Sequence, residues 1–138
     1  MQPDSFSPFG SSLVGIQNKR TVSLMSTLAE THITLARMVV IYPTPKDVEA
    51  FDRHYFEIHV PLAKKLPGLR KYEISDGPIA TPLDASLIHR IGTLYFDDLT
   101  ALQAAFASSE GQAAAADRRL FAPNDSGVQM YLFENREV

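Results

Sequence analysis

From residue 33 onward, the order of hydrophobic periodicities limits the fold that this chain can adopt. Apolar residues alternate or run continuously where a strand is expected, and recur every third or fourth residue where a helix is expected. The expected strands are Ile33–Tyr42, Gly68–Asp76, Leu87–Phe96 and Val128–Phe133, and the expected helices are Lys46–Leu66, Leu99–Ala107 and a segment from Ser109 to about Phe121. This order of strand, helix, strand, strand, helix, strand predicts a ferredoxin-like α+β fold, with an antiparallel four-stranded sheet and helices on one face.

Capping residues define where the expected helices begin and end. Pro67-Gly68 ends the first helix. Asp98 is the expected N-cap of the helix that begins at Leu99. Ser109 and Gln112 match a capping box, which makes Ser109 the expected N-cap of the last helix.

The strands are apolar on both faces, which a sheet with one face in water does not require. Met38 alternates with Val39 in the first strand, and Met130 alternates with Tyr131 in the last. The helices can cover only one face, and the expected elements leave no further segment for the other. A second copy of the same sheet would cover it, so we expect a two-fold homodimer. The alternative is a mildly apolar face in contact with water.

The first 32 residues differ in composition from the rest. Residues 1–26 hold six Ser and one acidic residue, Asp4, and their longest apolar patch is Leu13-Val14. That patch is too short for the core of a signal peptide. We expect residues 1–32 to form a disordered or extended arm before a domain of residues 33–138. An organelle transit peptide, or a true start at Met25, are the alternatives.

Composition excludes several classes of function. The chain has no Cys, which removes thiolate metal sites and Cys nucleophiles. Its net charge of −3 argues against nucleic-acid binding, and it has no apolar run of membrane-spanning length. Glycine-rich phosphate loops, the G-x-S-x-G motif and the H-E-x-x-H motif are also missing. We therefore expect a cytoplasmic protein without metal, cofactor, nucleic acid or membrane partner.

One histidine stands out as a candidate for chemistry. Tyr55 and His59 are neighbours at i and i+4, and Pro61 cannot donate to the carbonyl of Glu57, so the helix should bend there. A buried imidazole beside such a kink would have a lowered pKa and could act as a neutral general base. The alternative is a core histidine that donates to the freed carbonyl.

The remaining polar candidates are expected to be structural. His54 and His59 are five residues apart, or about 140° on an α-helix, so they should not share one ion. His54 should face away from the apolar stripe, and His89 should be solvated or packed. Arg118-Arg119 should be a solvated helix end.

Two short motifs at a fixed spacing suggest a family. They are His59-x-Pro61 and Leu66-Pro67-Gly68, followed by Tyr72, and a later segment over residues 92–102 runs from strand into helix. Together these resemble EthD-type proteins of the dimeric α+β barrel superfamily, over residues 33–138. The resemblance implies a small-molecule pocket between sheet and helices in each subunit. His59 is the polar position of that pocket that the motif matches.

The resemblance also implies a class of function. EthD-type proteins are associated with ethyl tert-butyl ether degradation alongside an oxidative system, and relatives in aromatic-polyketide pathways look like cofactor-free tailoring enzymes. We therefore expect an oxidoreductase-like, cofactor-independent enzyme for a small apolar or aromatic compound. The expected catalytic residues are His59, as the base, and a tyrosine that donates to an oxyanion, Tyr95 or else Tyr42. The expected substrate-binding residues are Tyr42, Tyr55, Phe56, Phe106 and Tyr131.

Two alternatives to an enzyme remain open at this point. The first is a non-enzymatic ligand-binding or accessory protein with the same dimer and pocket. It is favoured by the presence of one candidate base and no evident nucleophile. The second is a structural dimer in which aromatic side chains fill the space between helices and sheet.

Overall fold

Four strands form one antiparallel sheet in the computed structural model, which describes residues 35–138. The strands are β2 (Leu35–Pro43), β3 (Lys71–Ile74), β4 (Ile88–Phe96) and β5 (Gln129–Asn135). Their order in the sheet is β3-β4-β2-β5, and each neighbouring pair is antiparallel. This confirms the ferredoxin-like α+β fold. The expected arm of residues 1–32 and the expected strand start at Ile33 lie outside the described residues.

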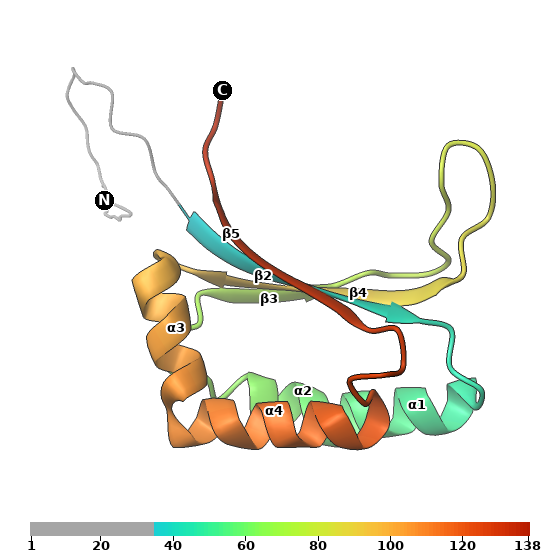
Figure 1. Ribbon diagram of the computed structural model, residues 1–138, viewed down its shortest axis with the longest axis horizontal. Coiled ribbons are helices and arrows are strands. Elements are labelled where there is room, and N and C mark those ends of the chain that lie inside the picture. The colour runs from blue at the N-terminus through green and yellow to red at the C-terminus, as the bar shows by residue number, and fades with distance from the viewer. Residues whose placement is uncertain (1–34) are drawn as a thin grey trace. The chain divides into compact units, whose positions relative to one another are not determined.

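The helices lie on one side of this sheet (Figure 1). They are α1 (Val48–His54), the π-helical turn η1 (Tyr55–His59), α2 (Val60–Ala63), α3 (Leu99–Ala107) and α4 (Ser109–Phe121). The single helix expected over residues 46–66 is therefore divided by a π turn. None of the helices within residues 35–138 is long and apolar enough to cross a membrane.

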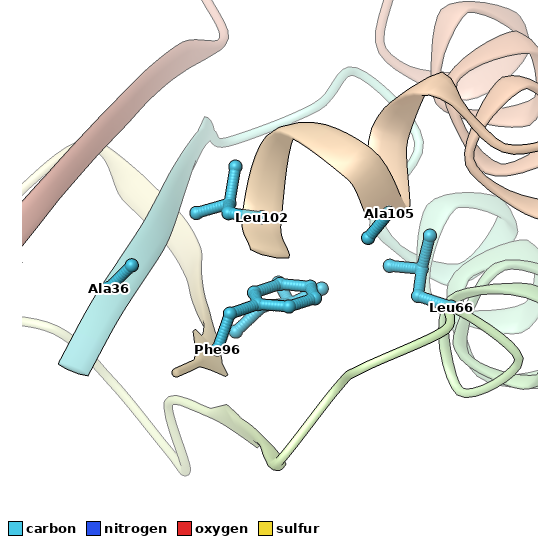
Figure 2. Packing of buried hydrophobic residues seen from close by; sticks show 6 residues of the cluster. Ala36, Leu66, Phe96, Leu102 and Ala105 are labelled. Atoms are coloured by element: carbon cyan, nitrogen blue, oxygen red, sulfur yellow. The ribbon is translucent and has the colours of Figure 1, made fainter. Parts of the chain in front are cut away.

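Strand register decides which side chains meet the helices. Ala36 is opposite Phe96, and Met38 is opposite Leu94 on β4 and Leu132 on β5. Phe96 and Leu102 are fully buried, and Figure 2 shows Leu66 of the segment after α2 and two α3 residues gathered around Phe96. Burial of such a side chain contributes about 1.5–3 kcal/mol, so this cluster fixes α3 against the sheet.

The opposite face of the sheet is covered by no helix of the described residues, and it carries apolar side chains beside a charged cluster of Arg37, Lys71 and Glu73. Its side chains alternate with those of the core: Val39 is opposite Tyr131 on β5 and Thr93 on β4, and Ile41 is opposite Ile91. Tyr131 is 50% exposed and Phe133 is 39% exposed. The sheet therefore carries apolar side chains on both faces, as the sequence pattern indicates.

The two predicted helix caps have different outcomes. Asp98 is the N-cap of α3, and its side chain accepts a hydrogen bond from the Ala101 N–H at 2.7 Å, as predicted. The N-cap of α4 is Ser108 and not Ser109, because the Ser108 hydroxyl accepts from the Gly111 N–H at 3.0 Å. The prediction was wrong by one residue because α3 and α4 abut, so that the residue ending one helix caps the next.

Candidate functional site

A cavity of about 100 Å³ lies between the sheet and the helices. Its wall is mostly apolar and aromatic, with a few polar side chains from different elements. Four of the residues predicted for the site line it: Tyr42, Tyr55, His59 and Phe106. Tyr72, Gly92, Arg118 and Met130 also line it, and the sequence argument had assigned none of them to the site. The cavity is thus a small apolar chamber with a few convergent polar groups, the usual form of a small-molecule site.

The π turn explains how His59 reaches this cavity. The Val60 N–H bonds to the Tyr55 carbonyl, five residues back, and Pro61 has no N–H to continue the α-helical pattern. A π turn stacks residues that are five apart in sequence. His54 and His59 therefore lie on the same side of the helix, and the prediction that they point about 140° apart was wrong, because it assumed α-helical geometry.

A carboxylate on α4 joins these two histidines. Asp117 Oδ1 lies 2.8 Å from His54 Nε2, and Asp117 Oδ2 lies 3.0 Å from His59 Nδ1. Asp117 is only 6% exposed. No motif in the sequence predicted a site role for Asp117. One sequence feature could have identified it: Asp117 is a charged residue three positions after Ala114 and six after Gly111, on the buried face of an alanine-rich helix.

The environment of His59 suits a neutral base. Burial lowers the pKa of His59, and its hydrogen bond to Asp117 and the charge of that carboxylate act in the opposite direction. The positive charges of His54 and Arg118 lower this pKa further. Because Nδ1 is held by Asp117, Nε2 is the ring nitrogen left for a molecule in the cavity.

Three tyrosine side chains supply hydroxyl groups near the same cavity. The hydroxyls of Tyr55 and Tyr72 are 2.7 Å apart and hydrogen-bonded. Gly92 permits this arrangement, because a Cβ at that position would lie 3.2 Å from the Tyr55 hydroxyl. Burial raises the pKa of Tyr42, Tyr55 and Tyr72. All three therefore stay protonated at neutral pH and can serve as hydrogen-bond donors.

Three of the predicted site residues lie elsewhere. Tyr95 is on the opposite face of the sheet, where its hydroxyl donates to Glu73 at 2.7 Å and its ring lies between Arg37 and Lys71. Tyr131 is on that face as well, opposite Val39. The expectation that they share the cavity was wrong, because residues that alternate with the core side chains of β4 and β5 must point away from the helices.

Helix geometry accounts for the other differences. Phe56 is 48% exposed and stacks with the Arg90 guanidinium, because the π turn directs it away from the cavity. Arg118 was expected to be solvated but is 8% exposed and lines the cavity, with Nη1 donating to the Ala122 carbonyl. His89 is packed as expected, with Nε2 2.8 Å from Asp52 Oδ1.

The arrangement is suited to proton transfer. Within residues 35–138 there is no group of three or more His, Cys, Asp or Glu side chains placed to hold a metal ion. The cavity instead presents one imidazole, oriented by a buried carboxylate, and the hydroxyls of buried tyrosines. Such a set can accept a proton from a bound molecule and donate a hydrogen bond to the anion that results.

Comparison with known proteins identifies relatives. The model of the EthD domain matches residues 44–125. An uncharacterized 11.0 kDa protein of the thcB-thcC intergenic region of Rhodococcus erythropolis is 38% identical over 104 residues, which are 74% of this chain and 95% of that protein. The crystal structure of an ethyl tert-butyl ether d (EthD) family protein from Bacillus halodurans has a TM-score of 0.64 and 32% identity, covering 75% of this chain and 99% of that one.

A more distant structure shares the fold. SnoaB from Streptomyces nogalater, described as a cofactor-independent oxygenase and solved as the mutant N63A, has a TM-score of 0.54. It is 13% identical to this chain, and the match covers 77% of this chain and 96% of SnoaB. At this identity the similarity concerns the fold alone.

Proposed function

The chain belongs to the EthD domain family, and from this premise we propose that it is a cofactor-independent enzyme acting on a small apolar or aromatic compound. The observation that carries the proposal is the orientation of His59 at the cavity wall. Its Nδ1 is held 3.0 Å from a buried carboxylate, and the residue itself is 7% exposed. An imidazole fixed in this way presents Nε2 as a base to a molecule in the cavity.

The proposed chemistry begins with abstraction of a proton. His59 Nε2 takes a proton from an acidic C–H or O–H group of the substrate, and Asp117 stabilises the imidazolium that forms. The Tyr42 hydroxyl donates a hydrogen bond to the negative charge left on the substrate. Tyr42 replaces Tyr95 in this role, because Tyr42 lines the cavity and is 2% exposed.

An oxidative outcome is the finer part of the proposal. An aromatic anion formed by proton abstraction can give electrons to dioxygen without a metal or flavin, whereas isomerisation or elimination needs proton transfer alone. The description of SnoaB, which has the same fold, as a cofactor-independent oxygenase supports the oxidative reaction. We place this reaction in a degradation or tailoring pathway, of which ether degradation is one example.

The test is turnover of a panel of phenols, polycyclic hydroxyaromatics and ethers by wild type and His59→Ala. We expect turnover by wild type and a loss of about 10²-fold or more in the variant, with an unchanged circular dichroism spectrum. His89→Gln is the matched control, since His89 is also bonded to an aspartate but does not line this cavity. Unfolding of His59→Ala would instead identify His59 as a packing residue.

A non-enzymatic binding or accessory protein is the second candidate. It is favoured by one observation: among residues 35–138, those that line the cavity include no Ser, Thr or Cys side chain that could act as a nucleophile. Saturable binding of a panel compound, with no product formed under air, would support this candidate over the enzyme.

The uncovered sheet face supports a homodimer. Half-buried apolar side chains from β2 and β4 and exposed aromatics from β5 lie together on it, including Val39, Ile91 and Tyr131. A second copy of the same face would remove them from water and form a two-fold dimer. The domain proposed to dimerise is residues 33–138, with residues 1–32 outside it.

A further inference from the structure

The two oxygens of the Asp117 carboxylate are hydrogen-bonded to two different imidazoles, and these imidazoles differ in their exposure to water. The side chain of His59 is 9% exposed and lines the cavity, whereas the side chain of His54 is 26% exposed. The Asp117 side chain between them is 7% exposed. Each imidazole uses a different oxygen, at 2.8 and 3.0 Å. The three groups therefore form a continuous chain from the cavity to the surface of the helix layer.

The charges around this chain restrict how many protons it can hold. Arg118, the next residue on α4, is buried, and its charge acts on His59. The titratable side chains that line the cavity from the strands are Tyr42 and Tyr72, and burial raises the pKa of both, so that they are neutral. With one imidazolium, the negative charge of Asp117 is balanced. With two, a net positive charge would be buried beside Arg118, which is unfavourable.

We propose that His54, Asp117 and His59 act as one acid–base unit, in which the single charge of Asp117 supports one imidazolium at a time and His54 is the exit for protons that His59 takes from the cavity. This inference rests on the proposed role of His59 as a base. It adds a positioning residue, His54, that does not touch the substrate and that the sequence argument had set aside as structural.

The protons of the abstraction step balance, and the unit returns to its resting state when Nε2 of His59 gives its proton to the product anion and Nδ1 of His54 takes one back from water. In the proposed resting unit the positive charge lies on His54, whose side chain is 26% exposed, and not on His59, whose side chain is 9% exposed, because a charge is less costly where water reaches it. When Nε2 of His59 gains a proton from the substrate, His54 loses its Nδ1 proton to water. One N–H bond forms and one breaks. The unit remains neutral throughout, and Asp117 keeps both hydrogen bonds.

The experiment is a titration of the histidine side chains by ¹H–¹⁵N NMR on the full chain without ligand. For wild type we expect two separate titration steps, with the resonances of both His54 and His59 moving in each step. In His54→Gln the side-chain amide can still donate to Asp117 but cannot become charged. We therefore expect the pKa of His59 to rise in this variant, because its competitor for the carboxylate is gone.

Two further variants separate charge sharing from packing. Asp117→Asn removes the shared charge, so the pKa of His59 should fall further. His89→Gln, which alters the other histidine–aspartate pair, should leave the titration of His59 unchanged.

The contrary results are distinct from failure of the proposed function. An unchanged pKa of His59 in His54→Gln, with independent single-step titrations in wild type, would overturn the inference and reduce His54 to a hydrogen-bond donor that holds Asp117. Absence of turnover across the substrate panel would count against the enzyme and leave this titration result standing.

Discussion

At the scale of single residues, the site depends on polar groups that are buried and held in place. His59 is oriented by Asp117, and the Tyr55 hydroxyl is oriented by Tyr72, at 2.7 Å. A buried polar group without such a partner would cost about 1–3 kcal/mol, so removing one member of either pair should destabilise the fold. The His59–Asp117 pair differs from the Tyr55–Tyr72 pair, because an imidazole titrates within the physiological pH range.

The lowered pKa of His59 predicts how stability depends on pH. Because burial lowers this pKa below the unfolded value of about 6.5, the unfolded chain binds more protons between the two values. The contribution of His59 is therefore complete above about pH 6.5 and is lost as the pH falls below it. The free energy of unfolding, measured by urea denaturation from about pH 8 to about pH 5, should fall less steeply in His59→Gln than in wild type.

The control for this measurement is Gln112→Ala, an exposed position without a titrating group, which should keep the wild-type slope. Equal slopes for wild type and His59→Gln would mean that His59 binds its proton as readily when folded as when unfolded.

At the scale of elements, the junction of α3 and α4 is the most constrained part of the helix layer. Gly111 lies in the first turn of α4, and a Cβ built there would lie 2.5 Å from Phe106 Cα and closer still to the Ala105 carbonyl oxygen. These are backbone atoms, which cannot move aside as a flexible side chain can. Phe106 also lines the cavity, so this junction connects the packing of the two helices to the site.

Gly111→Ala should therefore be destabilising, although alanine is the better helix former. We expect a loss of about 1–3 kcal/mol, because α3 and α4 must separate to admit the methyl group. The change is measured by urea denaturation against Gln112→Ala, a substitution at the exposed neighbouring position. A Gly111→Ala variant as stable as wild type would show that the junction can relax without cost.

At the scale of the whole molecule, the sheet formed within residues 35–138 has one face covered by helices and one face that no helix of this part of the chain covers, called the open face below (Figure 1). The open face brings together apolar side chains from β2, β4 and β5, among them Val39, Ile91 and Phe133. Such a face on a chain of 15.3 kDa fits pairing with a second copy.

The proposed dimer predicts a mass and a way to disrupt it. Light scattering of the wild type should give about twice the chain mass of 15.3 kDa. Val39→Asp, which places a charge at the centre of the open face, should give a monomer that remains folded. Ala116→Glu, on the exposed side of α4, should leave the dimer intact. A wild type of 15.3 kDa in dilute solution would contradict the proposal.

Local sequence by itself determined most of the element order. The β-branched runs of the strands, the spacing of Phe51 and Tyr55, and the N-cap at Asp98 act over a few residues, so their signals can be read in order along the chain. The kink before Pro61 was also predictable, because a missing N–H is a local fact. Its form as a π turn was not, since packing of the whole helix against the sheet decides the geometry of the turn.

Tertiary structure alone decided which residues form the site. In a strand that is apolar on both faces, alternation separates the two sets of side chains but does not indicate which set the helices cover. Periodicity therefore could not predict that Tyr42 faces the helices and that Tyr95 faces away from them. The contact of His59 with Asp117 joins residues 58 apart in sequence, and that of His54 joins residues 63 apart. Neither contact has a local signal, because each depends on how α4 packs against the π turn. The sequence predicted a buried histidine beside the kink, and only the fold supplied the carboxylate that orients its ring.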